Sequence, residues 1–223
     1  MFALMEPARQ VGGDFYDATA LDDDHVYVAV GDVSGKGLPA ALFMVRAITL
    51  LRMTLSKKKK FHTVLPRLNE LLCANNKDFT FLTLMVAMLN VRTGTLHLVN
   101  GGHNAPLLSA GGRPFTPLPV PKGALLGISD RVRYEVAEYQ LNPGDTLFLY
   151  TDGVTECEDE RQHLFSVEQM QAVLNTAVPP HTPRNLIAQL RQKLYDFAQD
   201  VARSDDITML ALTYLSADKG QSI

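Results

Sequence analysis

The sequence predicts an α+β fold in which helices and strands form separate layers. Apolar, β-branched segments of strand length come in consecutive runs joined by short turns, which favours antiparallel pairing. Helical patterns come in pairs between these runs and do not alternate singly with strands. The 223 residues, of which 46% are hydrophobic, are enough for one large domain or at most two.

The first half of the chain predicts one strand and two helices. The segment HVYVAVGDV at 25–33 is short and rich in β-branched residues, as strands are. The segment at 38–55 is too long for a strand and apolar on all sides, so we expect a mostly buried helix. Its surplus apolar surface either packs on both a sheet and a neighbouring helix, or partly docks a regulator or a second subunit. Leucines at helical spacing predict a second helix at 64–74.

In the second half of the chain, hydrophobic periodicity and turn residues again predict the elements. Glycine and proline mark the turns, and the last residues are polar and typical of a frayed tail. In chain order we expect hairpin strands within 81–112, a loop at 113–129, strands at 131–141 and 146–154, helices at 167–177 and 183–199, a closing strand at 205–215, and a flexible tail at 216–223.

Charge and cysteine content exclude several classes of protein. The net charge of −3 gives no basic field for nucleic acid. The run Lys57 to Lys60 is either a solvated helix end or a contact for an anionic partner or a membrane headgroup. Cys73 and Cys157 are far apart, which indicates a reduced cytoplasmic protein without a disulfide framework or a zinc site. No apolar stretch reaches about 18 residues.

Acidic residues follow one local pattern at four places. Asp14 follows two glycines, Asp32 and Asp152 end strand patterns, and Asp205-Asp206 open the last strand. Each acid taken singly is typical of a turn or a cap. Convergent carboxylates would repel one another, and no matching set of Arg or Lys flanks them. A divalent cation is the simplest relief, and all-oxygen ligands favour Mg²⁺ or Mn²⁺ over zinc. Spacing alone does not prove that the acids converge.

The loop GDVSGKG at 31–37 also invites comparison with phosphate-binding loops. It lacks the G-x-x-x-x-G-K-[ST] frame, and Lys36 is followed by Gly37 where a hydroxyl would be needed. The signal for a nucleotide site is therefore weak.

Five motifs together carry a family resemblance: PARQVGGDFYD, GDVSGKGLPAAL, NGGHNAP, LYTDGVTE and DDITML. In order and spacing they resemble the SpoIIE/RsbU-type serine/threonine phosphatases, the bacterial branch of the metal-dependent type 2C (PPM) superfamily. The resemblance covers residues 7 to 214. It implies a four-layer αββα sandwich of two antiparallel sheets flanked by helix pairs, with metals at one edge, and a catalytic domain at 1–215.

The same resemblance implies a metal-ligand set. Asp32 resembles the aspartate that bridges both metals, and the backbone carbonyl of Val33 follows it. Asp152 and Asp205 resemble the ligands of the first metal. Asp14 resembles the early acid near the second metal, which often acts through water.

Other positions are expected to support the site. Gly35 and Gly37 would let the loop turn beneath the substrate, and Gly153 and Asp206 flank the ligands.

Three residues are candidates for substrate binding. Ser34 stands where eukaryotic relatives place a proton-donating histidine. His103 is a possible substitute, although its loop favours a structural or hydrogen-bonding role. Arg9 is either a phosphate-binding arginine or a plain surface residue.

The implied function is hydrolysis of phosphoserine or phosphothreonine on a regulatory protein, through a water activated by two Mn²⁺ or Mg²⁺ ions. By resemblance the substrate is a phosphorylated STAS-type anti-sigma-factor antagonist in partner-switching stress signalling. An N-terminal sensor or receiver module in a longer parent protein and a homodimer are further expected partners; nucleic acid is not. The alternatives are a catalytically idle binding module of the same fold and, less compatible with the charge, a metal-dependent nuclease.

Overall fold

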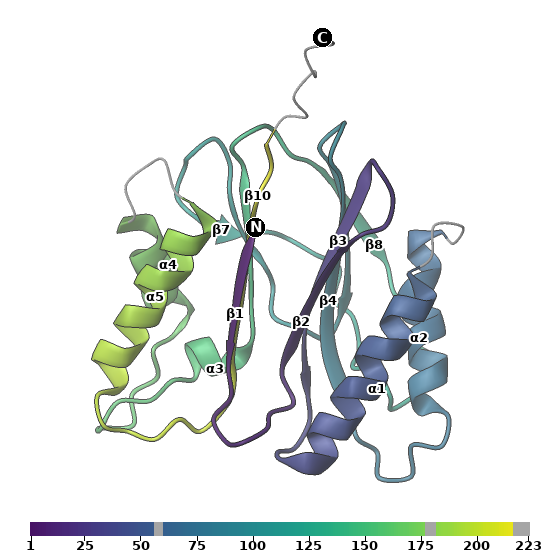
Figure 1. The fold of residues 1–223 in the computed structure, drawn as a ribbon, viewed down its shortest axis with the longest axis horizontal. Coiled ribbons are helices and arrows are strands. Elements are labelled where there is room, and N and C mark those ends of the chain that lie inside the picture. The colour runs from purple at the N-terminus through teal and green to yellow at the C-terminus, as the bar shows by residue number, and fades with distance from the viewer. Residues whose placement is uncertain (56–59, 177–181, 216–223) are drawn as a thin grey trace.

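The computed structural model describes residues 1–55, 60–176 and 182–215 (Figure 1). Most of the lysine run at 57–60 and the predicted tail at 216–223 lie outside these residues. Within them, no helix is both long and apolar enough to span a membrane.

Two five-stranded sheets form the centre of the molecule, and every strand pair in them is antiparallel. In spatial order, the first sheet contains β1 (Phe2–Glu6), β10 (Ile207–Thr213), β9 (Thr146–Tyr150), β6 (Leu107–Ser109) and β7 (Thr116–Pro117). The second contains β2 (Phe15–Ala20), β3 (His25–Val33), β4 (Leu82–Asn90), β5 (Thr95–Gly101) and β8 (Val136–Gln140).

A helix pair covers the outer face of each sheet (Figure 1). The pair on the second sheet is α1 (Leu38–Thr54) and α2 (Val64–Cys73), with a 3₁₀ turn at Phe61–Thr63 before α2. The pair on the first sheet is α4 (Val167–Thr176) and α5 (Pro183–Ala198), and the short α3 (Asp152–Thr155) follows β9. The predicted four-layer αββα sandwich is therefore confirmed.

Strand alternation divides the core into three apolar layers. Successive side chains of a strand point to opposite faces. On β3, Val28 and Val30 enter the layer between the sheets, whereas Ala29 faces α1 and α2. On β9, Leu149 lies between the sheets and Phe148 packs under α4 and α5. Both faces of these strands are buried, which explains their nearly continuous apolar sequences.

Several local predictions differ from the structure. The loop predicted at 113–129 contains the two-residue strand β7, and the strand predicted at 131–141 is confined to β8. Strands β1 and β2 were not expected, because the residues of β1 show no alternation and β2 carries a buried Asp17. The strand predicted at 146–154 ends at Tyr150, and Asp152 begins a helix instead.

The sequence predicted a mostly buried helix at 38–55, and this prediction is wrong. Among the described residues, one face of α1 has no neighbouring layer. Ala47 and Leu51 pack on the sheet and α2, while one stripe of its surface is exposed. The exposed fractions are 63% for Leu38, 63% for Leu42, 57% for Val45 and 66% for Met53.

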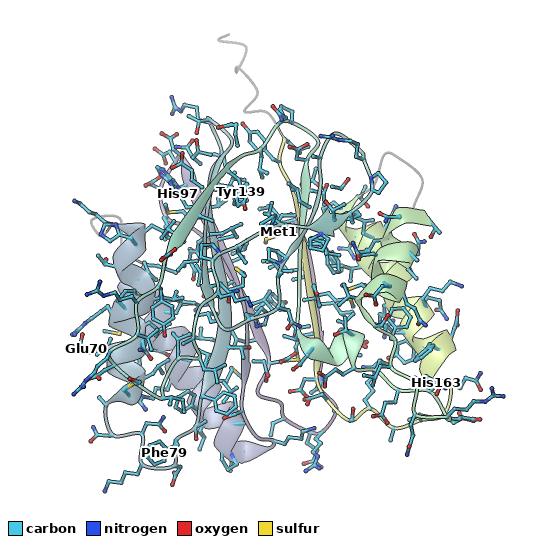
Figure 2. The ribbon with its side chains drawn as sticks, turned by 180° about the vertical axis from the view of Figure 1, so that it is seen from behind. Met1, Glu70, Phe79, His97, Tyr139 and His163 are labelled. Atoms are coloured by element: carbon cyan, nitrogen blue, oxygen red, sulfur yellow. The ribbon has the colours of Figure 1, made fainter. Side chains whose placement is uncertain are left out.

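The end of β3, the end of β9 and the beginnings of β2 and β10 lie at one edge of the sandwich, the lower edge in Figure 1. Figure 2 shows the molecule from behind, with Phe79 and His163 near this edge and His97 and Tyr139 towards the opposite one. The loops that carry the acidic motifs leave the sheets here.

Candidate functional site

The predicted acids come from four places in the chain that meet at this edge. Asp14 directly precedes β2, Asp32 is the next-to-last residue of β3, Asp152 begins α3, and Asp205 precedes β10. Both sheets contribute, so the site lies where the two halves of the sandwich join.

Asp32 is at the electrostatic centre of the group. Burial, and after it the negative charges of Asp152 and Asp205, together raise its pKa to about 7. Carboxylates perturb one another in this way only at short range. The charges of Asp152 and Asp205 therefore act on Asp32 across the join of the two sheets.

Asp14 is the most buried member of the group, with 1% of its surface exposed. The Thr151 hydroxyl donates a hydrogen bond of 2.7 Å to its Oδ2, and the Thr208 N–H donates one of 3.0 Å to that hydroxyl. Burial nevertheless raises the pKa of Asp14 to about 9, with contributions from the charges of Asp32 and Asp206. Thr151 had not been identified from the sequence, since its role depends on a strand that is distant in the chain.

Glu156 is a further acid that the sequence analysis missed. It follows α3, and burial together with the charges of Asp152 and Asp205 raises its pKa. The pKa of Asp152 is also raised, first by burial and then by Asp205. Glu156 therefore adds a fifth carboxyl group to the rim of the cluster.

Asp206 has a different task from Asp205. Its Oδ1 accepts a 2.8 Å hydrogen bond from the Ala8 N–H, and its Oδ2 accepts bonds of 2.8 Å from Gly13 and 3.4 Å from Asp14. Asp206 thus fastens the segment that carries Asp14 to the beginning of β10, in line with the supporting role expected for it.

Glycines allow the close approaches that this arrangement needs. A Cβ on Gly153 would lie 1.9 Å from the Asp206 carbonyl oxygen, and one on Gly13 would lie 2.6 Å from the carbonyl oxygen of Val33. Gly35 and Gly37 have open space around them. Glycine suits these two positions because their backbone has a positive φ, +88° and +76°.

In the described residues, none of the three substrate-binding candidates makes a hydrogen bond or ion pair with the acids. The Ser34 hydroxyl accepts a 2.9 Å hydrogen bond from the Phe81 N–H and extends the pairing of β3 with β4. Arg9 is exposed, and in the described parts of the chain its guanidinium makes no hydrogen bond or ion pair. Neither position supplies charge to the acidic group as it stands.

His103 braces the two sheets beneath the acids. The Thr83 hydroxyl donates to its Nδ1 at 2.8 Å, and its Nε2–H donates to the Tyr150 carbonyl at 3.1 Å. Thr83 is the register partner of Asp32, and Tyr150 ends β9 just before Asp152. Burial lowers the pKa of His103 to about 4, so the ring is neutral. Both ring nitrogens are used within the protein, which favours the structural role over contact with substrate.

Lys36 supplies the positive charge that the acids otherwise lack. Its Nζ lies 3.2 Å from Asp205 Oδ2 and also donates to the Ser204 carbonyl oxygen. Its charge opposes the rise in the pKa of Asp152. The sequence analysis considered Lys36 only as part of a nucleotide loop, because no local pattern relates it to Asp205.

The donor set fits a hard divalent cation, although the side chains are not arranged as a formed site. In the parts of the chain that the structure describes, no three His, Cys, Asp or Glu side chains are grouped so that they could hold a metal ion. Asp205 is engaged by Lys36, and Asp206 by backbone N–H groups. The observation in favour is the cluster itself, whose all-oxygen groups repel one another and have raised pKa values.

Comparison with known proteins decides the family. The sequence model described as Stage II sporulation protein E (SpoIIE) matches residues 22–215. The chain belongs to the SpoIIE family. Among SpoIIE-related proteins, it is 30% identical to phosphoserine phosphatase RsbU of Bacillus subtilis over 94% of this chain and 62% of RsbU. It is 27% identical to protein IcfG of Synechocystis sp. over 94% of this chain and 37% of IcfG. The chain thus spans between about a third and two thirds of these relatives.

Solved structures confirm the PPM phosphatase fold for this SpoIIE-family chain. The SiaA-PP2C domain of Pseudomonas aeruginosa superposes with a TM-score of 0.82 at 23% identity, over 96% of this chain and 85% of that one. RsbX, whose structure was determined in complex with magnesium, superposes with a TM-score of 0.68 at 16% identity, over 94% and 92% of the two chains. At such identities the likeness concerns the fold.

Proposed function

We propose that this chain is a metal-dependent protein serine/threonine phosphatase that acts on phosphoserine or phosphothreonine of a regulatory protein. The observation that carries the proposal is the group of mutually repelling carboxylates at one edge of a SpoIIE-family domain. Such a group has no role in a structural protein, where it only costs stability.

The residues proposed to hold two Mn²⁺ or Mg²⁺ ions are Asp14, Asp32, Asp152 and Asp205, with the carbonyl of Val33. When bound, the ions would supply the positive charge that makes a water nucleophilic near neutral pH and that offsets the charge of the phosphoryl oxygens. Thr151 orients Asp14, and His103 fixes the strand ends that present Asp32 and Asp152.

The proposed substrate is a phosphorylated STAS-type antagonist of an anti-sigma factor, in the cytoplasm. Support comes from the five motifs and from the likeness to RsbU, whose name describes it as a phosphoserine phosphatase. The relatives are longer than this chain, which agrees with a parent protein that carries an N-terminal sensor or receiver module. A homodimer belongs to the same proposal.

The competing function is an idle module of the same fold that binds its partner without hydrolysis. That function would be compatible with damaged ligands, yet all the predicted carboxylates are present at one edge. A nuclease would need a basic channel, which the net charge of −3 does not favour.

The test is phosphate release from a phosphorylated STAS protein with Mn²⁺, with Mg²⁺ and with excess EDTA. We expect turnover with either ion, none in EDTA, and no effect of a thiol-blocking reagent, because the site has no thiol nucleophile. Full activity in EDTA would overturn the metal dependence. Tight binding of the phosphoprotein without turnover, with either ion, would favour the idle module.

A further inference from the structure

Lys36 lies between two glycines in the loop that joins β3 to α1. Gly35 and Gly37 flank it at positive φ, and no atom lies within 4 Å of a Cβ built on either glycine. The lysine side chain itself is 41% exposed. Neither packing nor crowding therefore fixes the ammonium group, and its contacts with the 204–205 segment decide where it lies.

Those contacts join the two halves of the sandwich. Lys36 belongs to the loop after β3 in one sheet, and its partners Ser204 and Asp205 precede β10 in the other. Among the basic residues of the described chain, Lys36 is the one whose charge bears on the pKa of Asp152. Arg9, the arginine expected to serve phosphate, makes no comparable contact.

The ion pair with Asp205 is weak enough to exchange. Both side chains are about two-fifths exposed, at 41% and 42%, and exposed pairs of this kind contribute little. A divalent ion attracts the same carboxylate about twice as strongly as an ammonium group at equal distance. The two cations would also repel each other if both stayed on Asp205. A divalent ion that takes Asp205 as a ligand therefore drives Lys36 away.

The displaced ammonium group would remain at the mouth of the site. Its loop stays anchored by Asp32 on one side and by α1 on the other, so only the side chain and the glycine-flanked tip rearrange. A phosphoryl dianion held at the carboxylate edge is the anion within its reach, and charge-assisted hydrogen bonds from lysine suit it.

We propose that Lys36 is a phosphate-binding residue of this site, held on Asp205 until a divalent cation takes that carboxylate. This inference rests on the proposed function and adds to it a residue for substrate binding. The cation must then bind before phosphate, because the lysine leaves Asp205 only when a cation takes that carboxylate.

Two affinities test the proposal, and they are expected to change in opposite directions. In Lys36→Gln, Mn²⁺ measured by calorimetry should bind about two- to fivefold more tightly, because a competing charge is lost. Inorganic phosphate should bind the Mn²⁺-saturated variant about tenfold more weakly, because a charge-assisted hydrogen bond is lost. Lys36→Arg should stay close to the wild type in both measurements.

Lys193→Gln is the matched control, since Lys193 is also exposed and paired with an aspartate, but lies on α5 away from the acids. Neither affinity should change in it, and the melting temperatures of all variants should agree. An unchanged Mn²⁺ affinity in Lys36→Gln, or an unchanged phosphate affinity, overturns the proposal. If the wild type binds both probes as described but releases no phosphate from a phosphoprotein, the phosphatase function fails while the role of Lys36 stands.

Discussion

Asp152 begins α3 with a carboxyl group that the fold does not need. Burial and the charge of Asp205 raise its pKa, so its ionised form opposes folding. We expect Asp152→Asn to melt at or slightly above the wild-type temperature, as seen by circular dichroism. Its phosphatase rate should fall at least about a hundredfold, more than losing an outer-shell partner typically costs.

Asp23 is an exposed acid just before β3, at the opposite end of the strand from Asp32. Asp23→Asn is the control and should keep full activity. A variant at Asp152 that retained most of its rate would remove this residue from the ligand set.

Asp17 on β2 is a buried acid whose pKa is lowered, in contrast to that of Asp152. It accepts hydrogen bonds from Arg52 Nε at 2.9 Å, from Arg52 Nη2 at 2.7 Å, and from the Tyr27 hydroxyl. Burial acts to raise its pKa, but the bonds from Arg52 and Tyr27 outweigh it and the pKa is lowered. Asp17→Asn should therefore lower the free energy of unfolding at pH 7 by about 2 kcal/mol.

The sign of the pH dependence follows from the lowered pKa. The contribution of Asp17 is present above its unfolded value, near 3.8, and is lost as the pH falls through the lower folded value. Urea unfolding at pH 7 and at pH 3 should show the difference between wild type and Asp17→Asn shrinking at pH 3. An equal difference at both pH values would contradict the assignment.

At the residue scale, prediction from sequence relies on local signals. An acid at the end of an apolar strand pattern, before a glycine turn, is such a signal, and Asp32 and Asp152 were proposed as ligands from it. The contacts of Lys36 with Asp205 and of Asp206 with Gly13 join opposite ends of the chain. No local pattern encodes these contacts, so the sequence could not predict that Asp205 pairs with Lys36 while Asp206 binds backbone N–H groups.

Helix α1 combines a buried and an exposed apolar face. Leu51 is fully buried against the sheet and α2, whereas Leu42 is 63% exposed. We expect Leu51→Ala to cost about 2–5 kcal/mol of stability. Leu42→Ala should stay within about 0.5 kcal/mol of the wild type, since surface changes away from special contacts are small.

Chemical denaturation of the two variants side by side checks this. Equal losses would mean that the Leu42 face is covered in solution, which the described residues alone do not do.

At the scale of elements, composition predicted whether a segment is a helix or a strand better than it predicted where that element begins and ends. The helix at 38–55 was placed within one residue, but its apolar sequence could not tell which face lacks a neighbour. Strand β1 escaped prediction because its residues are half-buried at a sheet edge and show no alternation. In the segment that begins at 146, Thr151 and Asp152 turn the chain away from the sheet, which an apolar count does not register.

At the scale of the whole molecule, Gly12 lies where the segment before β2 packs closely on the segment before β10. A Cβ there would lie 1.9 Å from Asp206 Oδ2. Gly12→Ala must therefore displace the carboxylate that fastens the Asp14 segment to β10, and we expect a loss of about 1–3 kcal/mol together with weaker Mn²⁺ binding.

Gly111→Ala is the matched control: it has a positive φ of 60° but open space, so it should cost about 1 kcal/mol and leave Mn²⁺ binding unchanged. Thermal melts of both variants, with and without Mn²⁺, distinguish a loss of stability alone from a loss of Mn²⁺ binding. Unaltered Mn²⁺ affinity in Gly12→Ala would show that the Asp206 fastening does not shape the site.

The position of β10 has a consequence for how the protein is made. This last strand lies between β1 and β9, and the residues just before it supply Asp205 and Asp206. While the ribosome is still translating the preceding helix, one sheet lacks an inner strand and the carboxylate group lacks a member. A product that stops before residue 205 therefore lacks an inner strand of one sheet and two of the clustered carboxylates at the same time.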